Sequence, residues 1–253
     1  MKILRFVLLT ALLATSAQAE ENRYDLLGRM LLPFVSVFAR TTTSPNRALS
    51  FNVRLEQMTD LPADLADSHA ELALEYPDKL RLHGPVLGED VTICRRGQEL
   101  WAFPGSKIEA LLSAAAEAKK LPRLNPKFKL EPFTLPLPEK DLVFLPALFQ
   151  IKDIGSEPVD GEPCRVMDLF LMPELMRSLK AQGWAARVWI SKDAKPVRIS
   201  VAKPGWMIVV RIDHVEFAPK LPDRTWEPTT EQSADVMKLD PAKYQQLLGT
   251  LVK

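Results

Sequence analysis

The most constraining feature of this chain is a series of short segments in which apolar and polar residues alternate. Phe51, Val53 and Leu55 alternate with polar neighbours, as a half-buried strand requires. Comparable segments follow at intervals of about ten residues. They occupy residues 69–76, 79–83, 91–95 and 99–103. Strands that follow one another this closely are typical of an antiparallel meander.

The period of two returns in the second half of the chain. It occupies residues 164–171, 185–191, 197–202 and 206–217. No repeat or linker divides the sequence, so we expect residues 20–253 to form one domain. The predicted fold class is α+β, mainly β: a strongly curved antiparallel sheet of roughly nine to eleven strands with helices against its concave side.

Other segments carry apolar residues at helical spacing. These are residues 24–39, 106–120, 173–182 and a C-terminal tail at 240–253. A short, very apolar segment at 142–149 contains Pro146, which indicates a broken helix. Residues 121–138 contain five prolines and are expected to form an extended loop.

Residues 1–19 have the pattern of a secretory signal. Lys2 and Arg5 provide a positive start, an apolar run follows, and the segment ends in a small-x-small pattern at Ala19. The alternative is an N-terminal membrane anchor, but the apolar run is shorter than the roughly 20 residues that span a bilayer. We therefore expect cleavage after Ala19 and a periplasmic location.

Composition and local motifs give no support for catalysis. Lys and Arg number 33 against 32 Asp and Glu, so no excess of positive charge predicts binding to nucleic acid. The three histidines lack metal-ligand spacing, and no nucleophile elbow or phosphate-binding glycine loop is present. We expect no catalytic residues, metal or cofactor and no enzyme activity, although a site built from distant residues would leave no local pattern.

Two cysteines and two carboxylates leave structural questions. An oxidising compartment favours a disulfide between Cys94 and Cys164, while the alternative is two buried thiols on different strands. Both remain open because a sequence does not supply the Cα separation.

Glu71 and Glu75 alternate with apolar neighbours, so we expect both on a solvated strand face.

Four stretches share a pattern of aromatic, proline and turn residues. They are Tyr76-Pro77-Asp78-Lys79-Leu80-Arg81, Arg96-Gly97-Gln98-Glu99-Leu100-Trp101 with Phe103-Pro104, Val188-Trp189-Ile190-Ser191-Lys192-Asp193-Ala194-Lys195-Pro196-Val197-Arg198-Ile199, and Trp226-Glu227-Pro228 with Asp235-Val236. In order and spacing they resemble strand and turn motifs of the LolA-like family of periplasmic lipoprotein carriers. The resemblance covers roughly residues 24–237.

The resemblance implies an unclosed antiparallel barrel whose hydrophobic concave face, lidded by helices, holds acyl chains. The implied function is a carrier that holds lipid or the acyl chains of lipoproteins for delivery towards the outer membrane. Its partners would be lipoprotein-transfer proteins of the inner or outer membrane, and the protein would be a monomer. One alternative is an envelope sensor or scaffold that uses the same fold to bind a membrane protein. Another is that the apolar segments form only an ordinary core.

The expected cavity combines one face of several strands with the segment 142–149 as a lid. The strand positions follow from the alternation of side chains between the two faces of a sheet. The expected cavity residues are Phe51, Val53, Leu55, Leu72, Leu74, Leu80, Leu82, Leu142, Leu145, Phe149, Val188, Ile190, Ile208 and Val210.

Overall fold

The computed structural model describes residues 22–38, 46–60, 65, 67–86, 89–117, 129–133 and 139–251. The expected signal segment at 1–19 and most of the proline-rich stretch at 121–138 lie outside these residues.

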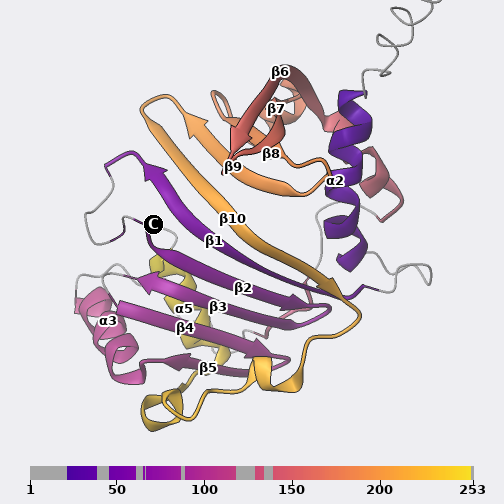
Figure 1. The fold of residues 1–253 in the computed structure, drawn as a ribbon. Coiled ribbons are helices and arrows are strands. Elements are labelled where there is room, and N and C mark those ends of the chain that lie inside the picture. Colours follow the sequence, from indigo (N-terminus) through magenta and orange to yellow (C-terminus); the bar gives the residue numbers. More distant parts are fainter. Residues whose placement is uncertain are drawn as a thin grey trace, which may run out of the picture.

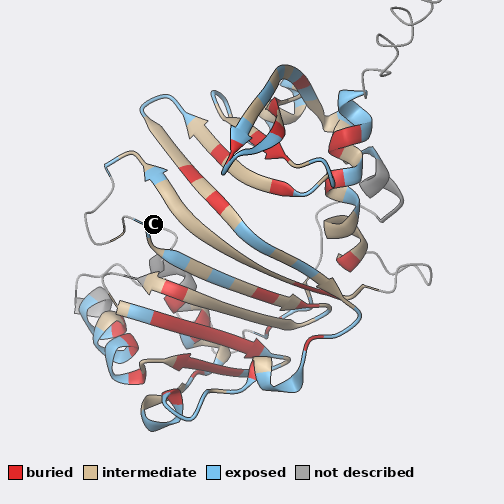
Figure 2. Ribbon diagram, in the orientation of Figure 1, coloured by how far each residue is buried: buried red, intermediate tan, exposed pale blue. Residues whose placement is uncertain are grey.

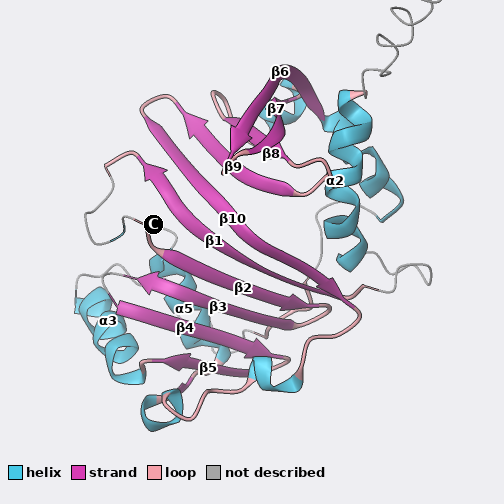
Figure 3. Cartoon of the chain, in the orientation of Figure 1, coloured by secondary structure: helices cyan, strands magenta, loops and turns pink. Residues whose placement is uncertain are grey.

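A single antiparallel sheet of eleven strands dominates the described part of the chain (Figures 1 and 3). In the first half the strands are β1 (Ala48–Met58), β2 (His69–Glu75), β3 (Lys79–Val86), β4 (Glu89–Arg96) and β5 (Glu99–Phe103). In the second half they are β6 (Phe149–Val159), β7 (Glu162–Leu171), β8 (Ala185–Ile190), β9 (Pro196–Lys203), β10 (Trp206–Ala218) and β11 (Met237–Lys238). The spatial order is β11-β5-β4-β3-β2-β1-β10-β9-β8-β7-β6.

The long strands β1 and β10 join the two halves of this sheet, and its ends, β11 and β6, do not pair with each other. The expected fold class is confirmed: the protein is mainly β, with an antiparallel sheet that is not closed into a barrel.

The strand register collects the apolar residues on one face of the sheet. Phe51 on β1 lies opposite Leu72 on β2, which lies opposite Leu82 on β3. Leu55 lies opposite Val210 on β10, so the same face continues into the second half. Side chains alternate between the two faces of a sheet, and residues that lie opposite each other on neighbouring strands share a face. These pairs therefore form one apolar face that extends across the sheet. We call it the helix-bearing face.

Helices cover this face at both ends of the sheet. Helix α2 (Arg23–Phe38) packs against β6, β7 and β8, where Leu27 is fully buried with Met167 and Ile190. At the other end, α3 (Gly105–Glu117) and α5 (Pro241–Leu251) pack on β4 and β5. The remaining described helices are short: η2 (Glu139–Leu148), α4 (Pro173–Ser178), η3 (Asp223–Trp226) and η4 (Gln232–Asp235). In Figure 2, β4 and β5 are largely buried, whereas β1 is mostly of intermediate exposure.

The opposite face is packed at the β2–β5 end by the segment that follows β10. Trp226 of η3 is only 1% exposed and lies in a cluster with Ala48, Ala73 and Leu221. The Trp101 indole Nε1 donates a hydrogen bond to the Trp226 carbonyl oxygen at 3.1 Å. This segment therefore buries part of a face that the alternation pattern predicts to be solvated.

Glu75 is affected directly, and the expectation that it is solvated is wrong. Its exposed fraction is 8%, and its carboxylate accepts hydrogen bonds from the Lys79 ammonium at 2.5 Å and from the Leu221 backbone N–H at 2.9 Å. Glu71, four residues earlier on the same strand, is exposed as expected.

Cys94 and Cys164 are free, buried thiols rather than a disulfide. Cys94 is on β4 and Cys164 on β7, and six strands lie between them in the sheet order. Neighbouring strands are about 4.8 Å apart, so the two Cα atoms are well beyond the roughly 7 Å that a disulfide can bridge. Of the two alternatives left open by the sequence, the structure has the buried thiols.

None of the helices in the described part of the chain has the length and apolar character needed to cross a bilayer.

Candidate functional site

An apolar groove lies on the helix-bearing face, over strands β1 to β4. Its volume is about 310 Å³. The residues that line it are Phe51, Val53, Ala70, Glu71, Leu72, Leu82, His83, Gly84, Pro85, Val91 and Ile93. Its floor is continuous on one side with the core beneath α3 and α5, because Val91 and Ile93 belong to both.

The groove is hollow because two small residues occupy adjacent positions in the sheet. Val53 on β1 lies opposite Ala70 on β2, and Gly84 on β3 lies opposite Val91 on β4. Gly84 in turn lies directly beside Ala70: a Cβ atom added at Gly84 would be 2.9 Å from the Ala70 Cβ. The row therefore has large side chains at its two ends and almost none in the middle.

The adjacent row provides the wall. Phe51, Leu72, Leu82 and Ile93 lie directly opposite one another on four successive strands. All four side chains are large and apolar. A bound chain would lie in the hollow over Ala70 and Gly84, with these four side chains along its side.

The two polar residues of the lining, Glu71 and His83, lie opposite each other on β2 and β3. Their positions alternate with those of Leu72 and Leu82, so their side chains point away from the apolar floor. His83 is held at both ring nitrogens: Nδ1 lies 2.9 Å from the Thr92 hydroxyl, and Nε2 lies 3.6 Å from the Asp90 carboxylate. Glu71 is exposed. Because the polar groups lie outside the apolar floor, the groove is suited to a nonpolar ligand and carries no evident nucleophile or proton donor at its base.

The structure assigns the fourteen expected cavity residues to different environments. Phe51, Val53, Leu72 and Leu82 line the groove. Leu74 and Leu80 face each other in the next row on the same side of the sheet, and both are half-buried. Leu55, Ile208 and Val210 continue this face across β1 and β10 and are also half-buried. Val188, Ile190 and Phe149 instead pack under α2, in the core.

The segment expected to be a lid lies elsewhere. Residues 139–148 form η2, whose principal contacts are with α2 and β6, and Phe149 begins β6. Leu145 is half-buried there, whereas the side chain of Leu142 lies outside the described part. Pro146 has no backbone N–H to donate the hydrogen bond of a regular α-helix, which favours a short 3₁₀ segment here. The Pro146 ring lies close to Gly28 of α2.

Sequence reasoning missed five apolar or small residues of the groove: Ala70, Gly84, Pro85, Val91 and Ile93. Two of them form the hollow. In the sequence, Ala70 and Gly84 are visible as small residues within otherwise apolar strands. They predict a hollow only when the strand register is known, because the register places them side by side.

In the described residues, no three His, Cys, Asp or Glu side chains gather in a way that could hold a metal ion.

No protein-family model matches the sequence, and no curated protein matches it. Several solved structures are similar in fold. The lipoprotein LppX of Mycobacterium tuberculosis is 13% identical with a TM-score of 0.41, and the match covers 79% of this chain and 99% of that one. A complex of MucA and MucB from Pseudomonas aeruginosa is matched at 12% identity and a TM-score of 0.42, over 84% of this chain and 63% of the matched chain.

A LolA superfamily protein from Nitrosomonas europaea is also among the similar structures. It is 14% identical with a TM-score of 0.28, and the match covers 78% of this chain and 96% of that chain. Identities and scores this low do not decide a function, so the case for one rests on the chain's own residues.

Proposed function

We propose that this protein binds the acyl chain of a lipid or of a lipoprotein in the apolar groove. The observation that carries this proposal is the hollow between Val53 and Val91, which is bordered by a row of four large apolar side chains. Its volume of about 310 Å³ lies at the lower end of the range usual for small-ligand sites.

The physical driving force is the removal of apolar surface from water. Each buried methylene contributes about 0.8 kcal/mol, so ten methylenes offer roughly 8 kcal/mol before the cost of ordering the chain. The groove needs no catalytic group for this task. The half-buried residues Leu55, Val210 and Ile208 extend the apolar face beyond the groove and offer a longer chain further contact.

The proposed role is that of a periplasmic carrier that delivers its cargo towards the outer membrane. The support for this location is the signal-like pattern of residues 1–19, together with the family resemblance of the strand motifs. Lipoprotein-transfer proteins of either membrane would be the donor and the acceptor of the cargo.

A second candidate function has its own observation. A hollow of about 550 Å³ lies between α2 and η2, and it is lined by two strongly exposed apolar residues, Leu32 at 62% and Phe144 at 63%. Exposed apolar surface of this kind marks interaction sites. It favours a sensor or scaffold that docks on a membrane protein.

A matched pair of substitutions tests the first proposal. Leu72→Glu places a carboxylate in the groove wall, where it would have no partner, so uptake of a fluorescent fatty acid should fall at least tenfold. Leu179→Glu makes the same chemical change at a leucine that is 60% exposed, and uptake should stay at the parental level.

Circular dichroism and thermal melting establish that each variant is folded. If folded Leu72→Glu bound the fatty acid as well as the parent, or if the parent bound none, the groove would be ordinary core surface. Native mass spectrometry of protein purified from the periplasm separates the two candidates. Co-purified lipid favours the carrier, and a stable lipid-free complex with a membrane protein favours the sensor.

A further inference from the structure

Two tryptophans and a lysine form a cluster at one end of the helix-bearing face. The Lys203 Nζ atom lies 5.0 Å from the centroid of the Trp184 ring and 5.9 Å from that of the Trp206 ring. The two rings meet edge to face, with their centroids 5.7 Å apart. Lys203 therefore lies against both indoles. We call these three residues the tryptophan corner.

Two turns bring the corner together. Lys203 and Trp206 lie opposite each other at the end of the β9–β10 hairpin, and Trp184 directly precedes β8. The two turns are in close contact, because a Cβ atom added at Gly183 would be 2.8 Å from the Pro204 ring. Gly183 also has a φ of +80°, which glycine adopts without strain. The corner lies at the end of these strands that is far from α2 (Figure 1).

The positive charge of the corner has no counter-ion in the described part of the chain. Lys203 is exposed and pairs with no described carboxylate, and neither half-buried indole donates its N–H to a described acceptor. An aromatic ring attracts a cation through its face but has no net charge. The corner therefore offers an anion one uncompensated ammonium and two indole donors.

Neighbouring charges leave an excess of positive charge around the corner. Helix α4 lies just before Trp184, and its Glu174 and Arg177 pair with each other at 3.4 Å. Lys180 follows them and is exposed. The exposed Asp60, two residues after β1, pairs with neither lysine among the described residues. An approaching anion is thus attracted to this end of the sheet.

An apolar strip joins the corner to the acyl groove. Trp206, Ile208 and Val210 are alternate residues of β10, so their side chains lie on the same face. Val210 lies opposite Leu55 on β1, and Leu55 is two residues from Val53 of the groove. Ile208, Val210 and Leu55 are half-buried, so each retains surface for contact with a bound chain. The corner and the groove therefore lie at two ends of one apolar strip.

The length of the strip selects for a long chain. Val53 lies opposite Ile212, which is six residues from Trp206 along β10. At a rise of 3.3–3.4 Å per residue, this separation is roughly 20 Å. A lipid that occupies both the groove and the corner consequently needs a long acyl chain.

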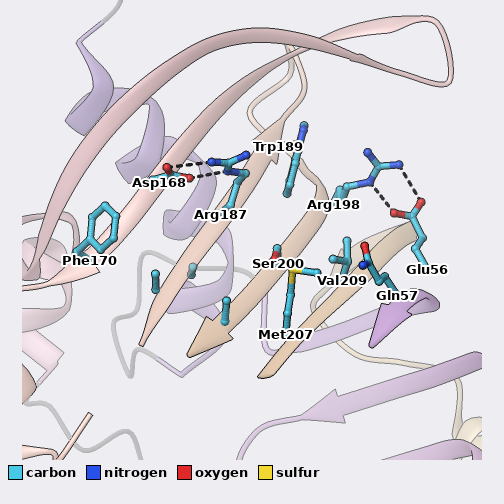
Figure 4. A pocket seen from close by; sticks show the side chains of 13 residues that line it. Glu56, Gln57, Asp168, Phe170, Arg187, Trp189, Arg198, Ser200, Met207 and Val209 are labelled. Carbon is cyan, nitrogen blue, oxygen red and sulfur yellow. Dashed lines mark hydrogen bonds and ion pairs between the residues drawn. The ribbon is translucent and has the colours of Figure 1, made fainter. Parts of the chain in front are cut away.

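The opposite face of the same strands offers no comparable cation. A trough of about 630 Å³ lies there, and it is lined by two arginines. Arg187 pairs with Asp168 at 2.6 Å, and Arg198 pairs with Glu56 at 2.6 Å (Figure 4). An anion in the trough would have to displace one of these carboxylates, whereas Lys203 has no such partner.

We propose that the tryptophan corner binds the anionic group of a single-chain lipid, so that the cargo of the groove is a free fatty acid. The carboxylate contacts the Lys203 ammonium beside the two indoles, and the chain follows Ile208 and Val210 into the groove. This inference rests on the proposed acyl-binding function and narrows its ligand. The acyl chains of a lipoprotein are attached through uncharged ester or amide groups and offer Lys203 no carboxylate.

The test compares cis-parinaric acid, a fluorescent long-chain fatty acid, with its uncharged methyl ester at pH 8, where the carboxyl group is ionised. The parent should bind the acid about fivefold more tightly than the ester. Lys203→Gln should weaken binding of the acid alone by about fivefold, and Lys203→Arg should retain the preference because it keeps the charge. Lys192→Gln, at an exposed lysine between β8 and β9, is the matched control and should change neither affinity.

Leu72→Glu separates this inference from the proposed function. It should weaken the acid and the ester alike, because both bury the same chain. Equal binding of acid and ester to the parent, or an unchanged affinity of Lys203→Gln for the acid, would overturn the anionic site and leave the acyl groove standing. If the parent bound neither ligand, both proposals would fail. Added salt provides an independent measurement and should weaken binding of the acid but not of the ester.

Discussion

Replacing Glu75 by alanine removes a buried carboxylate that fastens the segment after β10 to the sheet. Its two oxygens accept hydrogen bonds from different parts of the chain, the Lys79 ammonium at 2.5 Å and the Leu221 N–H at 2.9 Å. Glu75 is only 8% exposed, so water has little access to replace either hydrogen bond. The substitution therefore leaves a buried N–H without an acceptor and a half-buried ammonium without its counter-ion.

The expected loss follows from these two contacts. A buried donor without an acceptor costs about 1–3 kcal/mol, and loss of a charge-assisted bond adds to that cost, so we expect the free energy of unfolding to fall by roughly 2–4 kcal/mol. In a chain of this size, each kcal/mol lowers the melting temperature by about 2–4 °C. Glu75→Gln retains an acceptor for the Leu221 N–H and should lose less.

Urea unfolding followed by tryptophan fluorescence measures the effect, with Glu71→Ala as the control. Glu71 is exposed on the same strand, so its replacement should change the free energy of unfolding by no more than about 0.5 kcal/mol. If Glu75→Ala and Glu71→Ala were equally stable, the carboxylate would not fasten the segment, and the reasoning from its two hydrogen bonds would fail.

Two further predictions concern the groove and the thiols. Gly84→Ala places a Cβ atom 2.9 Å from that of Ala70, so it should lower stability by about 1–3 kcal/mol and weaken fatty-acid binding; a variant that melts at or above the parent would contradict this. Burial raises the pKa of the Cys94 thiol to about 12 and also raises the pKa of Cys164, so both should resist iodoacetamide at pH 8 and react in urea. Since the folded pKa of Cys94 exceeds the unfolded value, its contribution to stability is complete below about pH 8.5 and is lost as the pH rises towards 12. Cys94→Ala should flatten the decline between pH 9 and 11 by up to about 1.4 kcal/mol per pH unit, and rapid native labelling would refute the assignment.

Most strands could be predicted because their signal is local. The expected bounds of β5, residues 99–103, agree with the structure. Strand β6 was missed for a physical reason. Its first residue, Phe149, directly follows the apolar segment that begins at residue 142. A short apolar run of this kind is compatible with a buried helix as well as with a buried strand, so the sequence does not distinguish the two structures.

The groove could be predicted only in part. Alternation placed Phe51 and Leu72 on the correct face, since each strand alternates independently of its neighbours. The hollow itself depends on Ala70 lying beside Gly84, which is a property of register and not of either strand. The burial of Glu75 likewise depends on a segment more than a hundred residues away in the sequence.

The unclosed sheet has a consequence for solubility. A sheet with free ends offers unpaired N–H and C=O groups to other chains, and proteins counter this with short edge strands, charges, prolines and bulges. Both ends of this sheet carry such features. β11 has only two residues, and β6 has a register shift before Gly155, an exposed Lys152 and an exposed Pro158. Fibril-like stacking through the sheet edges is thereby discouraged, and Pro158→Val, which restores a donor and β propensity at one edge, should make concentrated solutions aggregate sooner.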